Sequence, residues 1–233
     1  MGDGAATKGD STSAGKETNR PSREKEGGPS LNSLALVRKA TTPHNILSMD
    51  IKDWHHVVYE GVLLKNDTQK FWVDAKHHKN CFMVLPKACV IAGGDEESCW
   101  YWITMELKCF RRDANIRVPK SKKLSWLFIQ GRFKTRALSP NTTYEVAFVV
   151  KLNRTDSEWS SRVELKLNLP DGTEQTNTED LGRRQEEWIN LRAGEFEMGP
   201  KTVGTISFAL QGTRIHPQKT GLILKGVLIH PKD

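Results

Sequence analysis

Short hydrophobic segments separated by turn residues constrain the fold of this chain more than any other feature. Residues 144–152 and 163–169 alternate between apolar and polar side chains, which is the period of a strand with one buried and one solvated face. Turn residues such as Pro170-Asp171-Gly172 recur at intervals of roughly 8–12 residues, and no convincing helical period intervenes. We therefore expect an all-β fold, an antiparallel β-sandwich or barrel. The expected strands are 61–64, 71–74, 81–85, 89–92, 100–105, 124–133, 144–152, 163–169, 188–191, 206–210 and 221–229.

The first 30 residues differ in composition from the rest of the chain. They are almost entirely polar or small, and Leu31 is the first large aliphatic residue after Met1. Such a segment cannot bury enough apolar surface to offset the entropy of ordering it, so we expect residues 1–30 to form a disordered tail. Residues 31–56 are expected to be a transition arm with a short helix at most, because Pro43 interrupts its apolar residues. The folded domain is then expected over residues 57–233.

The formal net charge of the chain is +7, and the whole excess lies in residues 31–233, since the first 30 residues are neutral. Moderate basicity favours acidic partners such as nucleic acid or anionic membrane surfaces without selecting one of them. One basic cluster is opposed only by Asp113. It can contact the phosphates of RNA. Alternatively it is a solvated loop or a nuclear-import signal, and such a cluster has one of these two roles more often than it binds nucleic acid specifically. The cluster consists of Lys108, Arg111, Arg112, Arg117, Lys120, Lys122 and Lys123.

Signals for export and membrane insertion are missing from the sequence. No stretch approaches the roughly 20 apolar residues needed to span a bilayer, and the first ten residues lack the apolar core of a secretory signal. We therefore expect a cytoplasmic protein that can also be nuclear. In reducing surroundings the cysteines should be buried free thiols rather than disulfides or zinc ligands. The glycosylation sequons at 66–68, 141–143 and 153–155 should then serve as turns.

The sequence contains no motif that indicates an enzyme. It lacks a G-x-S-x-G elbow, a phosphate-binding glycine loop before a helix, and H-E-x-x-H. The adjacent pairs His55-His56 and His77-His78 make no ready chelate, because neighbours on a strand point to opposite faces. We expect no catalytic residues, no metal site and no cofactor.

Seven tryptophans are a high number for a chain of this length. A sugar ring presents C–H groups on one face, so an exposed aromatic ring with polar neighbours is a natural platform for carbohydrate, although most tryptophans are packing residues. Trp100-Tyr101-Trp102 follows a polar loop at residues 93–98. In a regular strand Trp100 and Trp102 share one face and Tyr101 takes the other. A sugar-facing Trp100 with a buried Trp102 requires the strand to begin or bulge between them.

Further motifs are similar, in collinear order over residues 57–233, to those of the phloem protein 2 family, also called Nictaba-type plant lectins. The matching segments are 59–64, 71–74, 80–83, 124–133, 138–140, 148–152, 169–172, 188–189, 194–196, 221–222, 225–227 and 231–232. The resemblance implies a β-sandwich of jelly-roll type and a nucleocytoplasmic lectin for N-acetylglucosamine oligomers or N-glycan cores. It also implies a plant source, often phloem, and leaves self-association as a homo-oligomer open.

The resemblance places the sugar site around residues 91–102. It implies Trp100 as the stacking residue, Tyr101 and Trp102 as its supports, and Asp95 as an acceptor for sugar hydroxyls. The chain departs from the family at several positions: Gly93 replaces an aromatic residue, Cys99 a tyrosine, Thr205 and Gly212 two glutamates, and Gln218 a tryptophan. The alternative is a lectin scaffold that serves protein or RNA interaction through the basic surface of residues 108–123.

Overall fold

The computed structural model describes residues 1–2, 30–40, 51–110, 113–153, 162–181, 186–212 and 220–232, with the side chains of 51–53 left undescribed. The tail expected at residues 1–30 therefore lies almost wholly outside the described residues. None of the helices in the described ranges has the length and apolarity required to cross a lipid bilayer.

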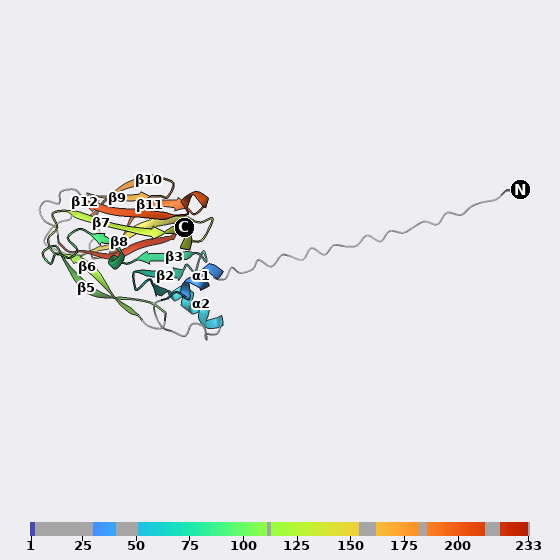
Figure 1. Cartoon of the computed structure of the whole chain (residues 1–233), viewed down its shortest axis with the longest axis horizontal. Coiled ribbons are helices and arrows are strands. Elements are labelled where there is room, and N and C mark those ends of the chain that lie inside the picture. The colour runs from blue at the N-terminus through green and yellow to red at the C-terminus, as the bar shows by residue number, and fades with distance from the viewer. Residues whose placement is uncertain are drawn as a thin grey trace.

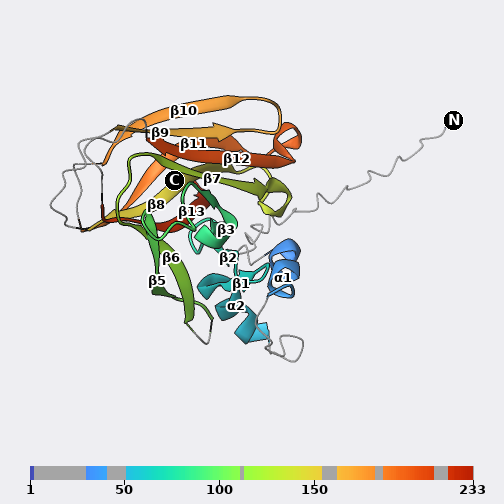
Figure 2. The ribbon, with the colours of Figure 1, turned by 60° about the vertical axis from the view of Figure 1, so that its left-hand side comes forward.

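The described strands form two antiparallel sheets that pack face to face (Figures 1 and 2). The smaller sheet has the order β10 (Glu174–Asp180), β9 (Arg162–Asn168), β12 (Thr205–Gly212), β7 (Leu127–Lys134) and β4 (Val90–Ile91). The larger sheet contains β1 (Val62–Leu64), β2 (Gln69–Val73), β3 (Asn80–Val84), β13 (Leu222–Pro231), β8 (Thr143–Leu152), β11 (Trp188–Glu197), β6 (Ala114–Ser121) and β5 (Trp100–Leu107). This antiparallel β-sandwich of jelly-roll type confirms the expected fold class.

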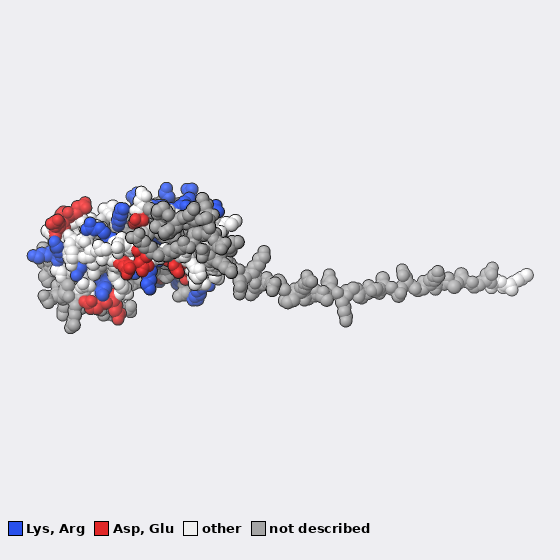
Figure 3. All heavy atoms as spheres, turned by 90° about the horizontal axis from the view of Figure 1, so that it is seen from below, with Lys and Arg blue, Asp and Glu red and all other residues white. Residues whose placement is uncertain are grey.

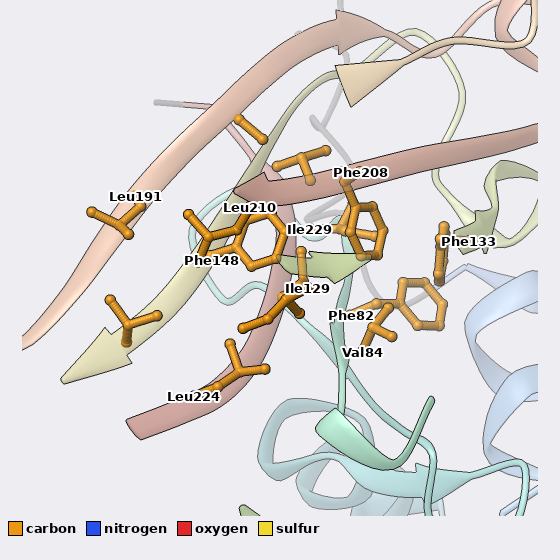
Figure 4. Close-up of a cluster of buried hydrophobic side chains, with 14 of the residues drawn as sticks. Phe82, Val84, Ile129, Phe133, Phe148, Leu191, Phe208, Leu210, Leu224 and Ile229 are labelled. Atoms are coloured by element: carbon orange, nitrogen blue, oxygen red, sulfur yellow. The ribbon is translucent and has the colours of Figure 1, made fainter. Parts of the chain in front are cut away.

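Apolar residues from the facing strands fill the space between the two sheets (Figure 4). Phe148 of β8 meets Phe208 of β12 edge to face, with ring centroids 5.9 Å apart. Along β9 the residues Val163, Leu165 and Leu167 are buried while the residues between them are half-buried, as the alternation predicts. Complete burial of one such side chain contributes about 1.5–3 kcal/mol to stability, so the sandwich depends mainly on this core.

Two strands were not expected from the sequence: the apolar residues of one are interrupted by charged residues and a proline, and the other has none. β6 lies within the basic segment, where pairing with β5 and burial of Ile116 and Val118 keep it extended. The solvated-loop interpretation is therefore wrong for residues 114–121. β10 has no apolar residue, and it pairs with β9 while the side-chain amides of Gln175 and Asn177 donate to backbone carbonyls of β11.

Two short helices precede the first strand and share the main core. α1 (Leu31–Val37) begins at Ser30, whose hydroxyl accepts a hydrogen bond from the Ser33 amide at 3.2 Å. α2 (Ile51–Glu60) contacts β2, and Val57 and Val58 are buried with Val37 in the core. The domain boundary expected at residue 57 therefore falls inside α2, and the arm contributes to the core of the domain.

Other local expectations concern turns and thiols. Asn66 and Asn141, which begin two of the sequons, have φ values of 53° and 50°; Asn66 lies in a turn, as expected, and Asn141 in a bend before β8. The third sequon extends into residues outside the described ranges. All four cysteines are free thiols, but only Cys81 is fully buried, whereas Cys89, Cys99 and Cys109 are half-buried. Burial raises the pKa of Cys81 and of Cys89 to about 12, so both thiols stay protonated at neutral pH.

A buried polar cluster, which we call the Tyr144 node, connects α1, β3, β8 and the short 3₁₀ helix η3 (Thr135–Ala137). The Tyr144 hydroxyl donates to the Asn80 carbonyl and accepts from the Ser139 amide, both at 3.0 Å. The backbone amide of Asn80 donates to the Ser139 hydroxyl at 3.0 Å. The Asn80 side chain accepts a hydrogen bond from the Ser33 hydroxyl and donates one to the Ala137 carbonyl. The node is buried, and burial raises the pKa of Tyr144 to about 12.

We expect Tyr144→Phe to lower the free energy of unfolding by about 1–3 kcal/mol, because it leaves the buried Asn80 carbonyl and Ser139 amide without their partner. Urea denaturation followed by circular dichroism measures the change. Tyr59→Phe is the matched control, because the Tyr59 hydroxyl bonds His78 at an exposed position, and its loss should cost less than about 0.5 kcal/mol. Equal losses in the two variants would contradict a structural role for the node.

Candidate functional site

The first three residues of β5 point alternately to opposite faces. β5 pairs with β6 in unbroken register from Trp100 opposite Ser121 to Leu107 opposite Ala114, so no bulge separates Trp100 from Trp102. The Trp100 side chain is only 2% exposed and packs in the main core. The expectation that its ring opens to solvent is therefore wrong, and in this geometry the ring cannot stack on a sugar.

The indole N–H groups of Trp100 and Trp102 hold the loop that precedes them. Trp100 Nε1 donates to the Ala92 carbonyl at 2.9 Å, and Trp102 Nε1 donates to the Gly94 carbonyl at 3.1 Å. Gly93 lies between these two carbonyls with a φ of 66°, a left-handed conformation that favours glycine. An added Cβ would lie 3.3 Å from Cys99. Glycine at this position therefore matches the tight loop that the two indoles hold.

Tyr101 points to the other face of β5 and is half-exposed. Lys120, directly opposite on β6, places its ammonium 5.7 Å from the centroid of the Tyr101 ring, and Lys122 places its own at 5.6 Å, both within cation–π range. The ring lines a surface groove of about 610 Å³, here called the Tyr101 groove. Its lining residues are Glu97, Ser98, Tyr101, Lys120, Ser121, Lys122, Lys123, Thr220 and Gly221.

Backbone hydrogen bonds fix the walls of the Tyr101 groove. The Gly221 amide donates to the Ser121 carbonyl at 3.0 Å, and the Leu222 amide donates to the Ser121 hydroxyl at 2.9 Å. The Lys122 amide donates to the Cys99 carbonyl at 2.8 Å, which joins the end of β6 to the loop before β5. The groove therefore has a rigid backbone frame, and the side chains of Ser98, Glu97 and the lysines surround one flat aromatic ring.

The predicted sugar-site residues are only partly brought together. Tyr101 lies in the groove, whereas Trp100 and Trp102 take the opposite face of β5. Asp95 is exposed on the loop but does not line the groove. Thr205 and Gly212 occupy the two ends of β12, and Gln218 lies outside the described residues. Glu97 and Ser98 of the groove belong to the polar loop that precedes Trp100 in the sequence. Thr220 could not be predicted as a neighbour of Tyr101, because only the pairing of β13 with β6 brings it there.

The predicted basic cluster is divided along the β5–β6 hairpin. Lys120, Lys122 and Lys123 line the Tyr101 groove, whereas Lys108 follows the far end of β5, roughly 20 Å away at the usual rise of a strand. Arg117 is exposed between them and donates to the Trp102 carbonyl at 3.4 Å. Arg111 and Arg112 lie outside the described residues. On the face drawn in Figure 3, basic and acidic side chains are interspersed.

Comparison with known proteins identifies the family. The family model described as "Phloem protein 2" matches residues 79–231. "Protein PHLOEM PROTEIN 2-LIKE A1" of Arabidopsis thaliana is 35% identical, over 87% of this chain and 81% of the relative. A protein described as "Lectin" from Luffa acutangula is 32% identical, over 76% of this chain and 82% of the relative.

Among solved structures, a xylan-binding domain from CBM 22 is similar over 57% of this chain and 82% of its own, at 12% identity. Its TM-score of 0.33 is too low to support a conclusion. The family match covers most of the strands that build the sandwich and all of those that build the Tyr101 groove. This chain belongs to the phloem protein 2 family.

Proposed function

We propose that this chain is a non-enzymatic, carbohydrate-binding lectin, that its ligands are N-acetylglucosamine oligomers or N-glycan cores, and that it binds them in the Tyr101 groove. The observation that carries the proposal is a half-exposed Tyr101 ring in a groove of about 610 Å³, bordered by hydroxyl, carboxylate and ammonium groups. A relative that is described as a lectin, from Luffa acutangula, supports the same class of function.

The chemistry of the groove suits a pyranose. The flat ring can stack on the C–H face of the sugar, as amphipathic aromatic residues do in binding sites. Ser98 and Thr220 can both donate to and accept from sugar hydroxyls, Glu97 can accept, and the lysine ammoniums can donate. The Ser121 hydroxyl already accepts a hydrogen bond from the Leu222 amide, so it positions the groove wall.

We expect Tyr101→Ala to weaken binding of chitotriose about 10- to 100-fold. Stacking of a nucleic-acid base on an aromatic side chain contributes about 1–3 kcal/mol, and loss of a similar contribution from a sugar ring corresponds to this change in affinity. Isothermal titration calorimetry of the full chain measures the affinity, and a glycan array defines the range of ligands.

Tyr101→Phe is the matched control, because it keeps the ring and removes only the hydroxyl, and it should retain most of the affinity. Trp100→Phe should instead lower stability, because it removes the bond to the Ala92 carbonyl. If the folded wild-type chain bound no saccharide on the array, the lectin proposal would fail. If Tyr101→Ala bound as tightly as wild type, the groove would not be the site.

A second candidate function is RNA binding, and one observation favours it. Lys120, Lys122 and Lys123 line the same groove as Tyr101, and lysines beside an exposed aromatic ring are typical of single-strand binding surfaces. The division of the basic cluster along the hairpin counts against a long phosphate track, because these three are the only lysines that line the groove within the described part of the chain.

If three phosphates are contacted, binding of a 20-nucleotide poly-U RNA should weaken with salt at a log–log slope of about −2, since single strands give about −0.7 per phosphate. Fluorescence anisotropy at several salt concentrations measures the slope. Replacing the three groove lysines with glutamine should remove binding, whereas the same change at three exposed lysines elsewhere should not: Lys39, Lys87 and Lys201. Equal effects of the two triple variants would indicate non-specific attraction.

A further inference from the structure

A second aromatic surface lies outside the Tyr101 groove. The side chain of Trp126 is 58% exposed, the largest exposed fraction among the tryptophans described. Its ring lies nearly parallel to that of Phe128 on β7, with an interplanar angle of 12° and centroids 5.8 Å apart. This offset stacking favours one orientation of the exposed indole.

Polar side chains continue from this aromatic pair across the outer face of the smaller sheet. The strand registers place Phe128 opposite Gln211 of β12, Gln211 opposite Glu164 of β9, and Glu164 opposite Thr178 of β10. Neighbouring strands are 4.7–4.9 Å apart, so these four residues form a row roughly 14 Å long. We call Trp126 together with this row the Trp126 platform.

Hydrogen bonds preorganise the polar part of the platform. The Gln211 side-chain amide donates to a carboxylate oxygen of Glu164, and the ammonium of Lys166 lies 3.3 Å from the same oxygen. These hydrogen bonds, that of Gln211 first, lower the pKa of Glu164, so the carboxylate stays ionised and remains an acceptor at neutral pH. A carboxylate and an amide side by side can bind adjacent hydroxyls of one sugar ring.

The charges around the platform favour an uncharged ligand. The Lys166 ammonium forms ion pairs with two carboxylates, that of Glu164 at 3.3 Å and that of Glu174 at 3.9 Å. Arg132 of β7 and Arg162 of β9 are exposed on the same outer face, so the face as a whole has no acidic excess. Balanced charge suits the hydroxyl groups of a neutral saccharide better than RNA phosphates or acidic glycans. The Tyr101 groove, which contains three lysines, is basic instead.

We infer that the Trp126 platform is a second saccharide-binding surface, which takes an uncharged, extended oligosaccharide lying across β7, β12 and β9. One sugar unit stacks on the Trp126–Phe128 pair, and the following units present hydroxyls to Gln211 and Glu164. The ligand class rests on the proposed lectin function, whereas the residues are separate from those of the Tyr101 groove. Only Leu124 and Ser125 separate Trp126 from Lys123 of the groove in sequence.

Titration of the full chain with chitotetraose and with cellotetraose in a calorimeter tests the inference. Trp126→Ala should lower the affinity of the platform about 10- to 100-fold, by the same stacking estimate as for Tyr101. Gln211→Ala should lower it about 2- to 10-fold, because it removes one hydrogen-bonding group. Trp188→Ala is the matched control: Trp188 is 40% exposed on β11 of the other sheet, and its loss should leave both affinities unchanged.

Tyr101→Ala in the same series separates this inference from the proposed function. If Trp126→Ala loses binding that Tyr101→Ala retains, the platform is supported, whatever the fate of the groove. If Tyr101→Ala loses all binding and Trp126→Ala loses none, the platform is overturned and the groove stands. Light scattering gives the oligomeric state, and a Trp126→Ala variant that dissociates a dimer while binding sugar normally would overturn the inference. Thermal melts confirm that each variant is folded.

Discussion

One edge of β13 is divided between two partner strands, and this division positions the candidate groove. Along its other edge β13 pairs with β8 from end to end, but on the divided edge Val227 pairs with β3 while Ile223 pairs with β6. Gly226 lies between these two contacts with a φ of 154°, and an added Cβ would lie 2.6 Å from the Val84 carbonyl oxygen. The β5–β6 hairpin therefore leaves the sandwich at this point, and the Tyr101 groove forms where it departs.

The aromatic residues of the chain divide into those that build the frame and those that are presented to solvent. An indole that is removed from solvent needs a partner for its N–H, and the buried Trp100 and the half-buried Trp102 find theirs in two carbonyls of one loop. Tyr144, near the start of β8, uses its hydroxyl in the same way: it bonds the Asn80 carbonyl of β3 and the Ser139 amide that precedes β8. Tyr101 and Trp126 have no comparable structural task among the described contacts, and both are accessible beside polar side chains.

The two proposed surfaces differ in charge. The Tyr101 groove combines its ring with three lysines, whereas the Trp126 platform combines its rings with a row of balanced charge on the outer face of the smaller sheet. A net charge of +7 would suggest one extended basic surface, but pairing of β5 with β6 separates Lys108 from Lys120 by the length of the hairpin. A lectin with two such surfaces could engage a branched or long glycan at two places at once, which raises overall avidity without any new contact.

The sequence by itself determined the fold class, the strands with two-residue alternation, and the family. These follow from local patterns, because core strands carry either an alternation of apolar and polar residues, as in 163–169, or a short apolar run, as in 81–85. β6 escaped prediction because its buried Ile116 and Val118 lie within a basic segment. β10 escaped prediction because pairing with β9 and side-chain amides stabilise it, rather than apolar residues of its own. Only the tertiary structure decided which ring of Trp100-Tyr101-Trp102 is buried and which one lines a groove. The face that becomes core depends on what packs against β5, and the register with β6 places Trp100 inside and Tyr101 in the groove.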